Sequence, residues 1–180
     1  YGLLFQAASA SLQELSADPT YLGAQIGFTA LLHTWSQRLD YHPHLHCIVT
    51  GGGLSVEGNR WIPSRRDFFL PVRVLSRLFR GKLLAQLKRA YAQGELSFSG
   101  STKAYEKATA FQALLTSLYE REWMVYCKPP FAGPEKMLDY LGRYSHRFAL
   151  SNDRLVQLAG DQVTFRYRDR RDHDRVKSLT

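Results

Sequence analysis

The sequence predicts an α+β fold in which a central, mostly antiparallel sheet is flanked by helices. Three observations support this class. The chain has 180 residues with a hydrophobic share of 44%, which is enough to bury a core and argues against disorder. Apolar residues recur at helical spacing in four segments, and short β-prone runs bounded by turn residues lie between them. We therefore expect residues 1–180 to form a single domain.

The first elements are expected to be one helix followed by strands. Residues 2–16 carry apolar side chains at helical spacing until a proline interrupts the pattern. Residues 26–33 are largely apolar, which is typical of a central strand. Residues 41–50 predict a second strand that ends at three successive glycines, and residues 54–62 predict a short hairpin after it.

Two long helices are expected next. Residues 71–93 carry an apolar stripe, and their other face is basic, which is typical of a solvated face and also suits phosphate contacts. Residues 105–121 repeat the apolar spacing and predict the second helix. The basic side chains on the first of these helices are Arg73, Arg77, Arg80, Lys82, Lys88 and Arg89.

The last third of the chain mixes strands with one more helix. Residues 123–127 are β-prone and predict a strand that two prolines end. Pro134 suits the first position of a helix, and Glu135 is favourable in its first turn. Residues 154–158 and 162–167 predict two strands, and the charged run after them predicts no closing element. Because the first residue falls within a helical pattern, we expect a piece of a longer protein.

Charge and composition indicate a polyanionic partner. Lysine and arginine number 24 against 16 acidic residues, a net charge of +8, which favours nucleic acid over a basic protein without such a partner. No apolar run is long enough to cross a bilayer, so no membrane partner is expected. The two cysteines fall in expected strands without a CxxC spacing, which suits a reducing, cytoplasmic compartment. The oligomeric state stays open.

The strand at residues 41–50 contains the pattern His44-Leu45-His46. Successive side chains of a strand point to opposite faces, so both histidines share one face, about 6–7 Å apart. Two imidazoles placed in this way can bind one divalent cation. The simpler interpretation is that they are polar side chains on a half-exposed strand.

A second pattern lies on the helix that begins near Pro134. Tyr140 and Tyr144 are four residues apart and therefore share one helix face. A phenol can attack phosphorus once a neighbour or a metal activates it. Flanking guanidinium groups, here Arg143 and Arg147, suit phosphate oxygens. The simpler interpretation is that both tyrosines are half-buried packing residues.

Together these patterns resemble the HUH superfamily of single-strand DNA endonucleases, which combine a His-apolar-His strand with one or two catalytic tyrosines on a helix. More closely, the chain is similar to the rolling-circle transposases of the insertion sequence ninety-one type. The likeness runs through most of the chain, in residues 27–35, 42–47, 69–72, 128–131 and 140–147. It implies an HUH endonuclease-like sheet and a bacterial, cytoplasmic enzyme that is nucleoid-associated when it acts.

The resemblance also implies a metal site. His44 and His46 would bind Mg²⁺ or Mn²⁺, of which Mn²⁺ is the better match for imidazole. Gln37 is slightly favoured over His42 as a third ligand. His33 is expected not to bind the metal, and neither is His146.

The same resemblance implies the chemistry and the substrate. Tyr140 or Tyr144 would attack single-stranded DNA, at transposon ends or at the target, to form a 5′-phosphotyrosine and a free 3′-hydroxyl. The residues expected to contact DNA are Arg143, Arg147, Lys128 and Lys136. The alternatives are a replication initiator or relaxase with the same chemistry, a metal-dependent hydrolase, and a DNA-binding remnant that does not cut.

Overall fold

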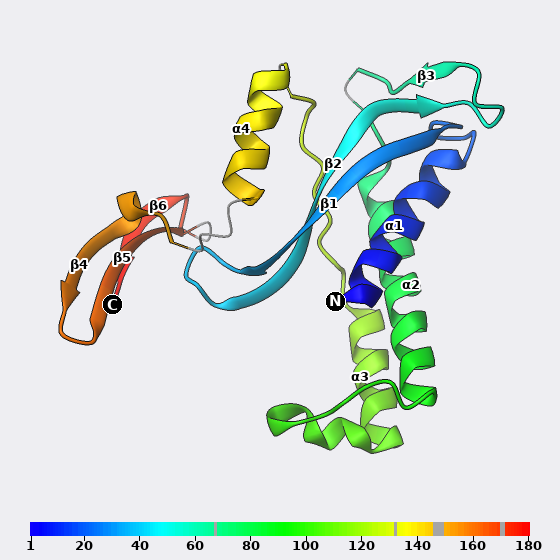
Figure 1. The fold of residues 1–180 in the computed structure, drawn as a ribbon. Coiled ribbons are helices and arrows are strands. Elements are labelled where there is room, and N and C mark those ends of the chain that lie inside the picture. The colour runs from blue at the N-terminus through cyan, green and yellow to red at the C-terminus, as the bar shows by residue number, and fades with distance from the viewer. Residues whose placement is uncertain (67, 132, 146–149, 170–171) are drawn as a thin grey trace. The chain divides into compact units, whose positions relative to one another are not determined.

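The fold is that of a computed structural model, which describes residues 1–180 except 67, 132, 146–149 and 170–171 (Figure 1). Its content of helices and strands confirms the predicted α+β class. The helices are α1 (Gly2–Ala17), α2 (Val72–Ala92), α3 (Ala108–Glu120) and α4 (Pro134–Ser145), with the short 3₁₀ helices η1 (Gly100–Glu106) and η2 (Asn152–Arg154). The strands are β1 (Gln25–Trp35), β2 (Tyr41–Leu54), β3 (Trp61–Pro63), β4 (Leu155–Ala159), β5 (Gln162–Asp169) and β6 (Arg175–Leu179).

The described strands form two separate three-stranded sheets, so the prediction of one central sheet is wrong. β2, the histidine strand, lies between β1 and β3, and β5 lies between β4 and β6. The local alternation that predicts a strand does not specify which sheet the strand joins. The chain divides into two compact units: unit 1 holds residues 1–28 and 49–130, and unit 2 holds residues 29–48 and 131–180.

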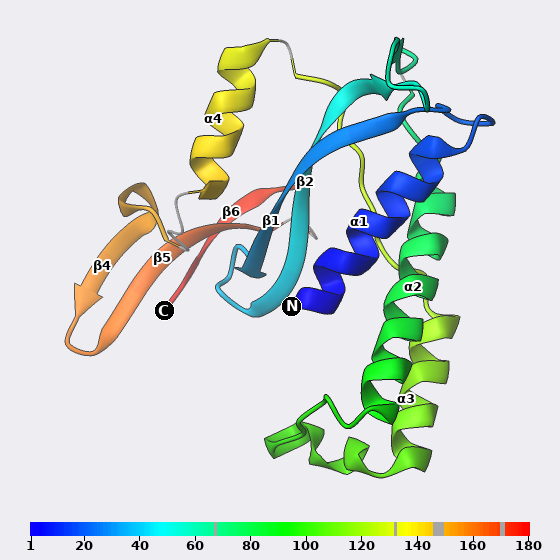
Figure 2. The ribbon, with the colours of Figure 1, turned by 45° about the vertical axis from the view of Figure 1, so that its right-hand side comes forward.

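Unit 1 is built on packed helices. α1 and α3 each pack against α2 (Figure 1 and Figure 2). The apolar stripe of α2 places Leu84 against Phe111 and Leu115 of α3, and all three side chains are buried. The ring of Tyr91 stacks on Phe111 with centroids 4.0 Å apart. Burying a side chain of this size contributes roughly 1.5–3 kcal/mol, so these contacts stabilise the helical core.

The glycine run of β2 allows backbones to approach closely. The strand continues through the glycines to Leu54, further than predicted, and residues Gly52 to Leu54 pair with β3. A Cβ at Gly53 would lie 2.3 Å from the carbonyl oxygen of Gln25, at the start of β1. Any side chain at this position would therefore force the two backbones apart.

Residues 123–127 are not a strand, so that prediction is wrong. The ring of Trp123 packs against Phe79 with centroids 5.6 Å apart, and its indole donates a 2.9 Å hydrogen bond to the carbonyl of Leu118. The next side chain, Met124, is 97% exposed. β-prone residues become a strand only where a sheet edge pairs with them, and here the anchoring contact is the helical core.

Unit 2 combines the turn half of the β1–β2 hairpin with α4 and the second sheet. α4 begins at Pro134, as predicted. β6 is a strand that the sequence did not predict, because its residues are mostly charged or polar. It pairs with β5 from Arg175 opposite Asp169 to Leu179 opposite Phe165. Within the described residues, we find no helix with the length and apolar character needed to span a bilayer.

Candidate metal centre and nucleophile

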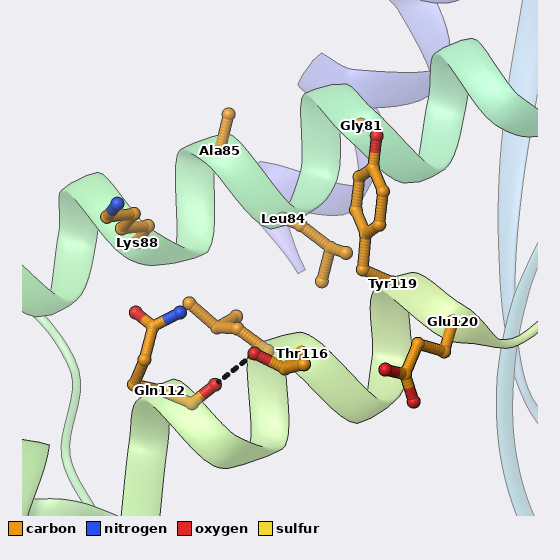
Figure 3. Close-up of a pocket in the computed structure, with 9 residues that line it drawn as sticks. Gly81, Leu84, Ala85, Lys88, Gln112, Thr116, Tyr119 and Glu120 are labelled. Atoms are coloured by element: carbon orange, nitrogen blue, oxygen red, sulfur yellow. Dashed lines mark hydrogen bonds between the residues drawn. The ribbon is translucent and has the colours of Figure 1, made fainter. Parts of the chain in front are cut away.

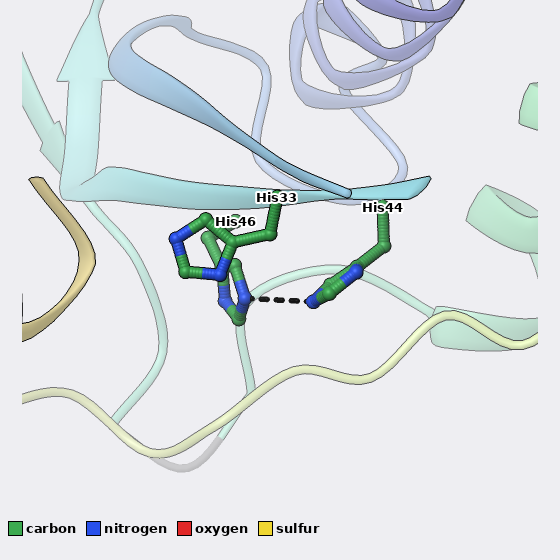
Figure 4. A group of neighbouring side chains, drawn as sticks. All are labelled: His33, His44 and His46. Atoms are coloured by element: carbon green, nitrogen blue, oxygen red, sulfur yellow. Dashed lines mark hydrogen bonds between the residues drawn. The ribbon is translucent and has the colours of Figure 1, made fainter. Parts of the chain in front are cut away.

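Three histidines from neighbouring strands lie together in unit 2 (Figure 4). His33 comes from β1, whereas His44 and His46 come from β2. One ring nitrogen from each histidine lies within 4.8 Å of the other two. The structure therefore brings together the predicted pair and adds a third imidazole to it. We call this group the histidine cluster.

His33 is the buried member of the histidine cluster, with 8% of its surface exposed. Its ring stacks on Trp35 with centroids 5.2 Å apart and meets the ring of His46 at 4.7 Å. The sequence led us to expect that His33 does not bind the metal, but the structure groups its ring with the predicted pair, so His33 becomes a candidate ligand. Sequence reasoning missed it because the β1 residue that faces His44 depends on the pairing register of the two strands.

Hydrogen bonds orient the imidazoles of β2. Nδ1 of His44 lies 2.8 Å from the carbonyl oxygen of His42. A carbonyl only accepts, so in the neutral ring Nδ1 donates and Nε2 presents its lone pair. A carbonyl in this role is a common outer partner of metal-binding histidines. His42 therefore contributes its backbone, while its exposed ring is not part of the histidine cluster.

The nitrogen spacing fits one divalent cation. Two nitrogens about 2.1 Å from an ion, at about a right angle, lie about 3.0 Å from each other. The Nε2 atoms of His44 and His46 are 3.0 Å apart. Imidazole is a borderline donor that matches Mn²⁺ better than Mg²⁺. The spacing of this pair and the chemistry of its donors therefore fit a divalent transition metal.

The hydroxyl of Tyr140 reaches the histidine cluster from α4. Its oxygen lies 2.9 Å from Nδ1 of His46, and the two ring centroids are 6.2 Å apart. Phe131, shortly before α4, also packs on the tyrosine, with ring centroids 5.2 Å apart. The two ring nitrogens of His46 thus face different partners. Its Nε2 faces His44 in the cluster, and its Nδ1 faces the phenol of Tyr140.

Gln37 lies in the turn between β1 and β2. Its backbone carbonyl accepts a hydrogen bond from the guanidinium of Arg154, and the residue lines a cavity together with Arg166 and Arg168. Its role as a third ligand stays a prediction. Among the described residues, the side chain that the structure groups with His44 and His46 is His33.

The remaining predicted site residues are only partly described. Tyr144 and Arg143 lie on α4, but their side chains are outside the described part of the chain, and Arg147 is outside it altogether. Lys136 is exposed in the first turn of α4. Lys128 is exposed and belongs to unit 1. The roles of these residues in catalysis and DNA binding stay predictions.

A hollow in unit 1 has different chemistry. A groove of about 400 Å³ lies between α2 and α3, with Leu84 and Leu115 in its walls (Figure 3). Its polar side chains include Lys88, Gln112 and Glu120, and its lining holds no histidine or cysteine. Among the described residues, the group of side chains suited to hold a metal is the histidine cluster of unit 2.

The fold and the site define an α+β protein in which histidines suited to a metal meet a helix-borne tyrosine. Comparison with known proteins places the chain more closely. Residues 27–180 match the model of a family described as "Putative transposase". The chain therefore belongs to this transposase family.

Two curated relatives are similar over most of the chain. It is 53% identical over 180 residues to "Putative transposase y4qJ" from Sinorhizobium fredii (strain NBRC 101917 / NGR234), covering 100% of this chain and 45% of that protein. It is 26% identical over 163 residues to "Transposase for insertion sequence element IS801" from Pseudomonas savastanoi pv. phaseolicola, covering 83% and 35%. The chain thus spans less than half the length of either relative. No solved structure matches it significantly.

Proposed function

We propose that the chain is the catalytic region of a transposase that cleaves and joins single-stranded DNA through a 5′-phosphotyrosine, as in HUH-type rolling-circle transposition of the insertion sequence ninety-one type. The observation that carries this proposal is the 2.9 Å contact between the Tyr140 hydroxyl and Nδ1 of His46, because it joins a nucleophile to the histidine cluster. Membership of a transposase family supports DNA as the substrate.

The metal would be held by His33, His44 and His46, with Mn²⁺ preferred to Mg²⁺. When bound, the ion would act as a Lewis acid on the scissile phosphate and orient it for in-line attack. Gln37 remains a candidate for an additional oxygen ligand from the adjacent turn.

The histidines would also set the protons around the nucleophile. A neutral histidine that binds a metal through Nε2 carries its remaining proton on Nδ1. In His46 this proton would be donated to the oxygen of Tyr140, 2.9 Å away. Such a donor stabilises the negative charge that develops as the phenol loses its proton to solvent. His44 is held in the same tautomer by the carbonyl of His42.

The reaction is a transesterification. The deprotonated oxygen of Tyr140 forms a bond to phosphorus, the bond from phosphorus to the 3′-oxygen breaks, and the leaving oxygen takes up a proton to become a 3′-hydroxyl. The phosphotyrosine retains the energy of the phosphodiester, so a 3′-hydroxyl can reseal the strand without ATP. Tyr144, one turn further along α4, would permit a second cleavage. The residues proposed to hold the DNA backbone are Arg143, Arg147, Lys128 and Lys136.

Adduct formation on a denaturing gel tests the proposal. The wild-type chain, mixed with Mn²⁺ and labelled single-stranded DNA that carries a candidate element end, should form a metal-dependent covalent adduct. Tyr140→Phe should reduce adduct formation by about 10³-fold or more, because phenylalanine has no nucleophilic oxygen. Tyr126→Phe is the matched control, because Tyr126 is 77% exposed and lies in unit 1.

Further variants separate the possible results. His46→Ala should lose the adduct together with metal binding. An adduct that Tyr140→Phe keeps and Tyr144→Phe loses would assign the attack to the second tyrosine. An undiminished adduct in the double tyrosine variant would refute the mechanism. Tight DNA binding without any adduct would identify a DNA-binding protein that does not cut.

A further inference from the structure

The charged side chains of the second sheet in unit 2 fall into two groups. Those of β6 are paired with acids. Lys177 lies 2.8 Å from a carboxylate oxygen of Asp169 and 2.9 Å from one of Asp172, and Arg175 lies 3.8 Å from Asp172. The carboxylates of Asp169 and Asp172 are therefore already engaged by cations of β6.

Arg166 and Arg168 of β5 form the second group. They are two residues apart on one strand, so they share one face of the sheet about 7 Å apart. Both are exposed, and within the described part of the chain neither guanidinium has an ion pair or a hydrogen bond. Phe165, which points to the other face, is buried. Two like charges side by side repel each other, and a ligand with negative charges would relieve that repulsion.

A cavity of about 230 Å³ adjoins these two arginines. Its lining consists of Gln37, Arg154, Arg166, Tyr167, Arg168 and Val176. Arg154 is held in place there: its Nε donates a 2.8 Å hydrogen bond to the carbonyl of Arg166, and a terminal nitrogen donates to the carbonyl of Gln37. Both of these acceptors are backbone carbonyl oxygens. Burial lowers the pKa of the Arg154 guanidinium, because solvent is partly withdrawn from it.

An aromatic side chain lies on the opposite face of the same strand. Tyr167 alternates with the two arginines, so it shares the face of Phe165, and the guanidinium of Arg38 lies 5.7 Å from its ring centroid. The face of Arg166 and Arg168 therefore offers charge for a backbone rather than a ring for base stacking. The turn that carries Gln37 also joins the two strands of the histidine cluster, so a DNA strand bound here would lie on the same hairpin.

We propose that Arg166, Arg168 and this cavity bind the sugar–phosphate backbone of single-stranded DNA, at a second surface separate from the histidine cluster. The choice of single-stranded DNA as the polyanion rests on the proposed function. Two arginines about 7 Å apart along one β-strand can each contact one phosphate of an extended DNA strand, because successive phosphates are separated by a similar distance. The surface would hold the substrate whether or not a metal is present.

Fluorescence anisotropy with a short labelled single-stranded oligonucleotide, in EDTA and over a series of salt concentrations, tests this surface. Arg166→Gln and Arg168→Gln should each weaken binding about 3–10-fold at low salt and reduce the slope of log K against log salt by about 0.7, the value for one phosphate contact to a single strand. Arg166→Lys should keep the slope, because it keeps the charge. Arg175→Gln is the matched control, since it removes one exposed positive charge from β6.

The control should bind within about twofold of wild type, because its partner is an acid on the protein. Equal losses in Arg175→Gln and the two β5 variants would overturn the inference, because only net charge would then matter. Unchanged binding by the double β5 variant, or no binding by the wild type, would also overturn it. DNA binding in EDTA is measured independently of cleavage. If the β5 variants bind more weakly but the wild type forms no adduct with Mn²⁺, the binding surface is supported and the nuclease is refuted. If the wild type forms the adduct but the β5 variants bind as tightly as the wild type, only the binding surface is refuted.

Discussion

The helical core of unit 1 differs from the part of the β1–β2 hairpin that carries the histidine cluster in unit 2, which we call the histidine hairpin. The main difference is in the kind of side chain that each buries. Among the described residues, every buried apolar side chain except Phe165 belongs to unit 1. Unit 2 exposes much of its apolar surface, with Leu158 71% and Leu138 60% exposed, yet it buries the polar ring of His33. Regions with few buried apolar contacts open more readily than a packed core. Buried apolar packing is therefore concentrated in unit 1, whereas the histidine cluster lies in unit 2.

This separation has a consequence for mutations. A truncation in the core of unit 1 should act on folding, because it removes packed contacts that nothing replaces. A truncation around the histidine hairpin should act first on ligand binding, because in the proposed function these side chains hold a metal or a DNA strand. The following predictions test that contrast.

The largest effect is expected from Phe111→Ala. The phenylalanine is buried between Leu84, Leu115 and the stacked ring of Tyr91, so its removal leaves a cavity and should lower the free energy of unfolding by about 3–5 kcal/mol. Urea unfolding followed by far-ultraviolet circular dichroism measures this change. Phe165→Ala is the corresponding variant in unit 2. It should lower the free energy of unfolding by less, because the exposed strands around Phe165 can collapse into the space that the ring leaves. An equal cost would break the contrast between the units.

An intermediate effect is expected from His33→Ala. Removing one of three imidazole donors should weaken Mn²⁺ binding about 10–100-fold, measured by isothermal titration calorimetry or by the electron paramagnetic resonance signal of free Mn²⁺. His42→Ala is the matched control, because it keeps the carbonyl that orients His44. A similar loss of Mn²⁺ affinity in both variants would contradict a role of His33 as a metal ligand. Gln37→Ala, titrated beside them, decides whether that residue is a ligand.

The smallest effect concerns the two thiols. Cys47 is half-buried on β2, whereas Cys127 is exposed and lies outside any strand, contrary to its predicted place in one. Partial withdrawal of solvent from the sulfur raises the pKa of both thiols, so both stay mainly protonated at neutral pH and their modification should speed up as pH rises. Cys127 should react about threefold or more faster with a thiol reagent, because access differs. Faster labelling of Cys47, identified with Cys127→Ser, would show that the hairpin opens freely.

Much of the local structure could be predicted because its cause is local. The apolar spacing over residues 71–93 predicted α2, and the proline at position 134 predicted the start of α4. The prediction of a strand at residues 123–127 was wrong, and β6 was not predicted, for the same reason. Both depend on whether another strand pairs with the segment, and neither hydrophobicity nor charge within five residues specifies that partner.

The candidate site divides in the same way. The sequence by itself determined that His44 and His46 share one face, because side chains alternate along any strand. Only the tertiary structure decided that His33 joins them and that Tyr140, 94 positions after His46, comes within 2.9 Å of its ring. Strand register and the packing of a distant helix set those contacts, and both arise from interactions between segments that no local pattern records.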